Sequence, residues 1–157
     1  MNFFTSVLNA QFERLHERSS LFVSLIPVDQ IYWQPRANPN GLPVYSCGEY
    51  ILRSAGRIEQ TFGGIATRLW DDPFEWTLPE ELDNNQKILE YLSEVEATRA
   101  KGFTLFVSDA DLNKEILAPG GLKTIFALLL DTLAQAENFQ GRAFATFRLF
   151  SDASLPR

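Results

Sequence analysis

The sequence predicts an all-α protein: a four-helix bundle formed by one domain, 1–157, with long structured crossover loops between helices. Three observations lead to this prediction. Apolar residues recur at helical spacing in four long segments, no segment shows a convincing period-two alternation, and prolines and glycines gather between the segments. A chain of 157 residues is also the size of one domain, and it can bury a core without a disulfide or a metal.

The first helix is predicted over about 2–25, where apolar residues such as Phe12 and Leu15 alternate with charged ones at helical spacing. Pro27 ends it, because proline cannot continue a helix. The following segment, 27–45, is rich in proline and also contains aromatic residues. We expect it to be a structured loop that packs on the bundle rather than a flexible linker.

The second helix is predicted over about 46–68. Ser46 is a favourable N-cap residue, and Glu49 three residues later completes the pattern of a capping box. The segment 69–79 then contains two prolines, which exclude a regular helix, and two tryptophans with a phenylalanine. We expect this aromatic segment to cover an end of the bundle or to form a dimer contact.

The third helix is predicted over about 83–107, and a short polar helix over 109–116. Pro119, Gly120 and Gly121 then break the chain. The last helix, predicted over about 122–150, carries the most regular apolar stripe of the sequence.

Charge and cysteine content restrict the possible partners. Fourteen basic and twenty acidic residues give a net charge of −6, which disfavours binding to nucleic acid or to an anionic membrane surface. The longest apolar run is far shorter than the ~20 residues that span a bilayer. A single cysteine gives no sign of an oxidising compartment, and no signal peptide is evident. We therefore expect a cytoplasmic protein that binds neither nucleic acid nor membrane.

The sequence contains one histidine, His16, and one cysteine, Cys47. A catalytic zinc site usually requires two or three histidines with carboxylate or thiolate support, which these two residues cannot supply. Nucleophilic triads would require the same histidine, and nothing in the spacing supports one. We interpret His16 as a residue at the edge of a buried helix face, and we predict no cofactor.

Two interpretations of Cys47 are open. It follows the N-cap of the second helix, and a helix N-terminus lowers the pKa of a thiol, so a reactive thiol is one possibility. The favoured interpretation is a small residue of the core.

Other polar clusters have simple structural explanations. The adjacent carboxylates at 71–72 and 80–81 fit turn and helix-start chemistry better than paired acid–base catalysis. The glycine pairs at 63–64 and 120–121 lack the strand and the Lys-Ser or Lys-Thr pair of a phosphate-binding loop.

A polar line on the last helix borders its apolar stripe. Asp131, Gln135, Asn138 and Arg142 are spaced by four, three and four residues, so they share one line along the helix. The favoured interpretation is a partly buried hydrogen-bond network between helices. The alternative is the lining of a cleft.

The order of these motifs resembles the DinB-like (damage-inducible-B-like) family of helical bundles. The carriers of the resemblance are Trp-Gln-Pro at 33–35, Ser-Cys-Gly-Glu at 46–49, Asp-Pro-Phe-Glu-Trp at 72–76 and Gln-Gly-Arg at 140–142. It covers nearly the whole chain, although each motif is short. It implies a left-handed four-helix bundle, often a homodimer.

Members of that family typically hold a divalent metal with three histidines, one on the second helix and two on the last. The matching positions here are Arg53, Gln135 and Phe139. A permanent cation repels a metal, and a phenylalanine ring offers no lone pair. If the alignment slips by one residue, Ser54 replaces Arg53 and is no better as a ligand. The resemblance therefore implies a degenerate metal site.

These observations lead to a metal-free bundle that binds an unknown small ligand or a partner protein. Its remnant cleft would be lined by Arg53, Asp131, Gln135, Phe139 and Arg142. Arg53 would occupy the place of the metal charge, bound either to Asp131 or to an anionic ligand. Enzymatic activity is left open. The alternatives are a divergent thiol-dependent transferase and a stress-response scaffold without a small ligand.

Overall fold

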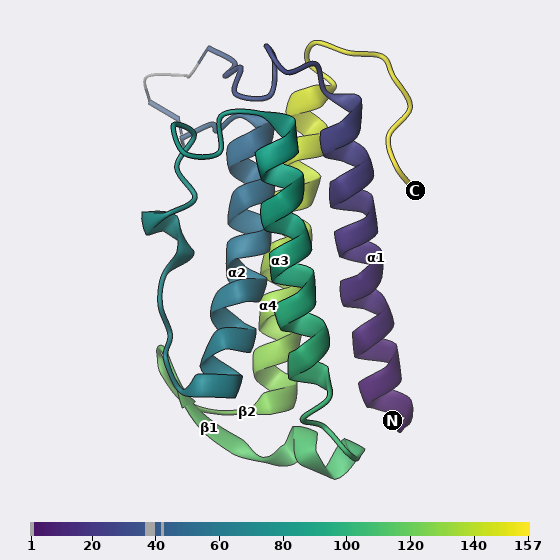
Figure 1. Ribbon diagram of the computed structural model, residues 1–157, viewed down its shortest axis with the longest axis vertical. Coiled ribbons are helices and arrows are strands. Elements are labelled where there is room, and N and C mark those ends of the chain that lie inside the picture. The colour runs from purple at the N-terminus through teal and green to yellow at the C-terminus, as the bar shows by residue number, and fades with distance from the viewer. Residues whose placement is uncertain (1, 37–39, 42) are drawn as a thin grey trace.

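The computed structural model describes residues 2–36, 40–41 and 43–157. It confirms a helical protein built around four long helices (Figure 1). These are α1 (Phe3–Leu25), α2 (Cys47–Thr67), α3 (Asn85–Phe103) and α4 (Ile125–Phe147). The shorter elements are the 3₁₀ helices η1 (Pro73–Glu75) and η2 (Asp109–Asn113) and the strands β1 (Glu115–Ala118) and β2 (Gly121–Thr124).

The helices are arranged as two parallel pairs of opposite direction. Figure 1 shows α1 and α4 running from the lower end of the bundle to the upper end, and α2 and α3 running the other way. Around the bundle, α2 packs on α3 and α4, and α1 packs on the same two helices from the opposite corner. Because α2 and α3 are parallel, the segment 68–84 must return along the whole length of the bundle.

Phenylalanine rings fill much of the core. One cluster joins three helices through Phe12, Phe62 and Phe103, with ring centroids 5.3 to 5.9 Å apart. A second cluster places Phe22 of α1 against Phe147 of α4. Such tilted and edge-to-face pairs add to the stabilisation that comes from burying the rings.

The start of α2 is fixed as the sequence predicts. The side chain of Ser46 accepts a hydrogen bond from the backbone N–H of Glu49, and Glu49 accepts one from the backbone N–H of Ser46. Partial burial acts to raise the pKa of Glu49, but hydrogen bonds from Ser46 and Gln34 and the charge of Arg53 hold it below its ordinary value. The capping box is therefore confirmed.

A buried arginine joins α1 to α3. Arg99 is only 1% exposed, and its guanidinium donates to both carboxylate oxygens of Glu96 and to the side-chain oxygen of Asn9. The carboxylate of Glu13 lies 3.5 Å from the same group. A buried guanidinium is tolerated when carboxylates and other acceptors surround it, as they do here.

The predicted absence of strands is wrong. Residues 115–124 form an antiparallel hairpin, and η2 replaces the polar helix that was expected over 109–116. Each strand has four residues, which is too short for a clear period-two pattern, although Ile116 and Ala118 are buried and alternate with exposed residues. Gly120 and Gly121 have φ values of +90° and +119°, which suit glycine at the hairpin turn.

The hairpin also shifts two predicted boundaries. The third helix ends at Phe103 rather than near 107, and the last begins at Ile125 rather than near 122. Thr124 caps α4, because its side chain accepts a hydrogen bond from the N–H of Ala127. Within the described part of the chain, no helix is both long and apolar enough to cross a membrane.

Candidate functional site

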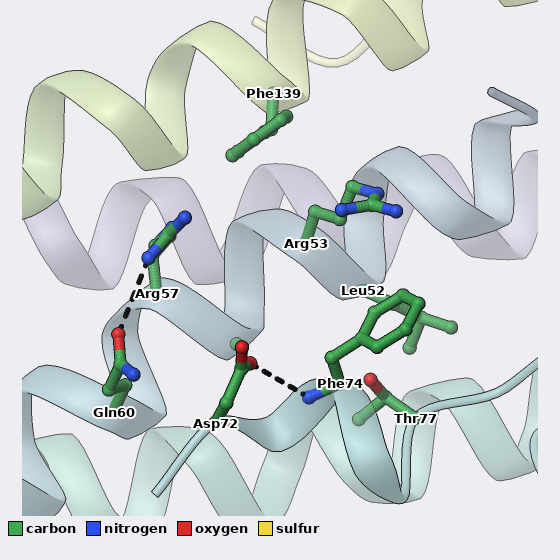
Figure 2. A pocket seen from close by; sticks show the side chains of 9 residues that line it. Leu52, Arg53, Arg57, Gln60, Asp72, Phe74, Thr77 and Phe139 are labelled. Atoms are coloured by element: carbon green, nitrogen blue, oxygen red, sulfur yellow. Dashed lines mark hydrogen bonds between the residues drawn. The ribbon is translucent and has the colours of Figure 1, made fainter. Parts of the chain in front are cut away.

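A pocket lies between α2, α4 and the returning segment 68–84, with a volume of about 90 Å³ (Figure 2). It brings together Arg53 and Phe139, two of the residues predicted to line a remnant cleft. The other three, Asp131, Gln135 and Arg142, are exposed on α4 and do not line it. The lining residues are Leu52, Arg53, Gly56, Arg57, Gln60, Asp72, Phe74, Thr77 and Phe139.

The orientation of α2 about its own axis places Arg53 in the lining of this pocket. The neighbouring Ser54 is buried between the helices, where its hydroxyl donates to the backbone carbonyl of Ala136 at 2.8 Å. Arg57 follows Arg53 by one helical turn and therefore lies on the same face. Its guanidinium donates to the side-chain oxygen of Gln60 at 3.3 Å, within the same lining.

Arg53 is partly buried and stacked on aromatic rings. Its guanidinium carbon lies 4.0 Å from the ring centroid of Tyr45 and 5.2 Å from that of Phe74. No described carboxylate lies within 4.0 Å of its nitrogens. The suggested Arg53–Asp131 pair is not formed, because Asp131 binds the ammonium group of Lys123 at 2.8 Å.

The opposite wall is built by η1 and its flanks. Asp72 caps η1 by accepting a hydrogen bond from the N–H of Phe74 at 3.1 Å. Thr77 donates its hydroxyl to the carbonyl of Pro73, and that proline lies beside Gly56 of α2. Asp72 thus has the turn role that its sequence context predicts.

Two tryptophans attach the returning segment to the bundle. The ring of Trp70 lies directly on Gly64 of α2, where any side chain would collide with it. Glu59 of α2 accepts hydrogen bonds from the Tyr91 hydroxyl and from Trp76, and burial keeps the pKa of Glu59 above its ordinary value. Trp70 is partly buried in this arrangement, whereas Trp76 is still 44% exposed.

A second pocket of about 380 Å³ adjoins the first. The two share Leu52, Arg53, Phe74 and Thr77. The second is completed by Tyr45, Glu49, Leu78, Pro79 and Glu80. Arg53 and Phe74 therefore lie between the small pocket and a larger one, whose walls combine Tyr45, Leu78 and Pro79 with two carboxylates.

The interpretation of the polar line on α4 as a partly buried network is wrong. Asp131, Gln135, Asn138 and Arg142 are all exposed. The buried polar contacts of α4 are made instead by Thr132 and Gln140, which lie one and two residues away from this line. Thr132 bonds to Thr61 of α2 at 2.7 Å, and the Gln140 amide donates to Ser19 of α1 at 2.8 Å. A shift of one residue rotates a position by about 100°, which is enough to move it from core to solvent.

Cys47 is a core residue, as the favoured interpretation predicts. Its side chain is fully buried, and the thiol donates to the carbonyl of Ala143 at 3.4 Å. Burial raises the pKa of Cys47 to about 12, so the thiolate is scarce at neutral pH. The reactive-thiol alternative is therefore not supported. His16 is partly buried at the edge of the α1 core face, as expected.

The residues at the family's metal positions do not fit a metal. Arg53 supplies a fixed positive charge, Phe139 supplies no donor atom, and Gln135 lies outside the pocket. Among the residues that the structure describes, no three His, Cys, Asp or Glu side chains group closely enough to hold a metal ion. No mechanistic step through a metal can be derived from these residues.

Neither a protein-family model nor a curated protein matches this sequence. The pocket must therefore be interpreted from its own geometry. Sequence reasoning missed Arg57, Gln60 and Thr77, and for Asp72 it favoured a turn role over acid–base catalysis without considering ligand binding. Arg57 was detectable, because it lies four residues after Arg53 and so shares its helix face.

Proposed function

We propose that this chain is a DinB-like helical bundle without the family's metal site, and that it binds a small anionic molecule in the pocket at Arg53. The observation that carries the proposal is the state of that side chain. Arg53 is partly withdrawn from water and fixed by two aromatic rings, yet its nitrogens have no carboxylate partner among the described residues.

A guanidinium in this position favours an anion. Its planar fork of donors matches a carboxylate or a phosphate group, and charge-assisted hydrogen bonds are roughly twice as strong as neutral ones. Stacking on Tyr45 and Phe74 holds the fork in place, so less side-chain freedom is lost when a ligand binds. Arg57 adds a second positive charge to the same lining, in a protein whose net charge is −6.

The size of the pocket limits the ligand. Pockets for drug-sized molecules measure roughly 300–1,000 Å³, whereas this one measures about 90 Å³. A compact charged group fits it, and any remaining part of the molecule would extend into the adjoining pocket of about 380 Å³.

Titration calorimetry with small carboxylates and inorganic phosphate tests the proposal. We expect binding to the unmodified protein and a loss of affinity of about tenfold or more in Arg53→Gln. Arg142→Gln is the matched control, because it removes the same charge from an exposed position outside the pocket. Absence of binding for every anion, or equal losses in the two variants, would contradict the proposal.

A divergent thiol-dependent transferase is the alternative function. Cys47 does not suit such a reaction, since it is buried and its pKa is raised, so the thiol would have to come from a small molecule. Incubation of the purified protein with a low-molecular-weight thiol and an electrophilic acceptor, with and without Ni²⁺ or Zn²⁺, separates the two functions. Enzymatic turnover that disappears in Arg53→Gln would favour the transferase.

A further inference from the structure

The pocket at Arg53 is lined by charges of both signs. Arg53 and Arg57 approach it from α2, and Asp72 approaches it from the segment that forms the opposite wall (Figure 2). None of these three side chains forms an ion pair with another described residue. One carboxylate oxygen of Asp72 accepts the capping hydrogen bond from Phe74, and the other has no hydrogen-bond partner among the described residues.

The separation of these charges is informative. Asp72 and the two arginines line one small pocket, yet no nitrogen of either arginine lies within 4.0 Å of an Asp72 oxygen. Opposite charges that face a common space without meeting can both be neutralised by a molecule placed between them. Such a molecule would direct an anionic group towards α2 and a cationic group towards Asp72.

The volume indicates how large the doubly charged group is. A pocket of about 90 Å³ is small beside the roughly 300–1,000 Å³ of pockets that hold drug-sized molecules. That space suits a carboxylate and an ammonium group on one shared carbon better than two charges at the ends of a long chain. The adjoining pocket has Tyr45, Leu78 and Pro79 in its walls, together with the carboxylates of Glu49 and Glu80. An apolar side chain of the ligand would lie against the first three residues.

From this arrangement we infer that the ligand carries an α-amino-acid head group, with its carboxylate on Arg53 and Arg57 and its ammonium on Asp72. The inference rests on the proposed anion-binding function and specifies the class of anion. Both a free amino acid and a γ-glutamyl peptide carry this head group, and titration with each distinguishes the two sources.

Three matched ligands test the head group by calorimetry: L-phenylalanine, 3-phenylpropionate, which lacks the ammonium group, and 2-phenylethylamine, which lacks the carboxylate. We expect phenylalanine to bind about tenfold or more tightly than either analogue. L-Leucine extends the test to an aliphatic side chain, and γ-glutamylglycine tests the second source.

Asp72→Asn is the decisive variant. Asparagine still accepts the capping hydrogen bond from Phe74, so η1 is preserved while the negative charge is lost. We expect phenylalanine to bind this variant no more tightly than 3-phenylpropionate. Asp71→Asn, which removes the same charge from the neighbouring exposed residue outside the pocket, should keep the full preference for the amino acid.

The outcomes separate this inference from the function on which it rests. If 3-phenylpropionate binds as tightly as the amino acid and Arg53→Gln abolishes both, the anion site is supported and the head-group inference is wrong. If Asp72→Asn and Asp71→Asn reduce the preference equally, Asp72 does not contact the ammonium group, and the inference is again wrong. If no amino acid, γ-glutamyl peptide or carboxylate binds, both proposals fail.

Discussion

Arg99 and Arg53 lie on the two parallel helices α3 and α2 and show two different uses of the same side chain. Arg99 is almost fully buried, and its donors are occupied by Glu96 and Asn9, with Glu13 nearby. Arg53 is partly buried and stacked on two rings, with no described carboxylate in contact. The guanidinium of Arg99 therefore finds its hydrogen-bond acceptors within the protein. Among the described residues, Arg53 has no carboxylate within 4.0 Å and acts on Glu49 only through its charge. Its guanidinium can therefore still bind an anion directly, which is why we assign it to a ligand.

The largest expected loss of stability comes from replacing Arg99, whose guanidinium already has hydrogen-bond acceptors within the protein. Arg99→Ala removes a buried partner from Glu96 and leaves a cavity, so we expect a loss of about 3 kcal/mol of unfolding free energy. Arg53→Ala should cost less than about 1 kcal/mol without ligand. Urea denaturation followed by circular dichroism measures both. Equal losses of unfolding free energy in the two variants would contradict the distinction between Arg99 and Arg53, because Arg53 would then be a structural residue.

A smaller effect should follow from disturbing the contact between Trp70 and α2, which attaches the segment 68–84 to the bundle. In Gly64→Ala the new methyl group would collide with the ring of Trp70, and such overpacking costs about 1–3 kcal/mol. Tryptophan fluorescence should shift at the same time. Gly63→Ala is the matched control, since it meets nothing within 4 Å and should keep or raise stability. An unchanged Gly64→Ala protein would mean that Trp70 does not hold the segment 68–84 in place.

The smallest effect concerns the capping box next to Arg53. The pKa of Glu49 lies below its ordinary value of 4.5, so ionised Glu49 stabilises the folded protein above pH 4.5. This contribution is lost as the pH falls from 4.5 through the lower pKa of the folded state. Glutamine keeps the capping pattern without titrating.

Melting curves between pH 3 and pH 7 compare the unmodified protein with Glu49→Gln. The destabilisation on acidification should be smaller in the variant, by about 0.5 kcal/mol. Identical pH profiles would show that Glu49 contributes no pH-dependent stability.

Helix positions could be predicted from the sequence because the signals are local. The capping box at Ser46 and the stripe around Phe62 each require only the neighbouring residues. The hairpin could not be predicted, because strands of four residues are shorter than the pattern that identifies them. The hardest feature to predict was which residues of α4 face the core. A shift of one residue along the helix leads from Asp131, which is exposed, to Thr132, which is buried.

The pocket was only half predictable for a related reason. Arg53 and Phe139 were identified as positions that the resemblance matches to metal-binding histidines, and both line the pocket. Asp72 and Phe74 belong to a segment whose path depends on tertiary contacts, such as the packing of Trp70 on Gly64. Nothing local in the sequence brings an N-cap aspartate opposite a pair of arginines.

The parallel direction of α2 and α3 has a consequence for how such a protein can diverge. A helix of 21 residues is ~31 Å long, so any connection between these helices must run that distance over the surface. In this chain the connection also supplies Asp72 and Phe74 to the pocket. Mutations there can alter which molecule is accepted while the helical core stays unchanged. Selection for a new ligand would therefore act first on the exposed positions of 68–84, such as Asp72 and Phe74, because surface segments tolerate sequence change better than the core does.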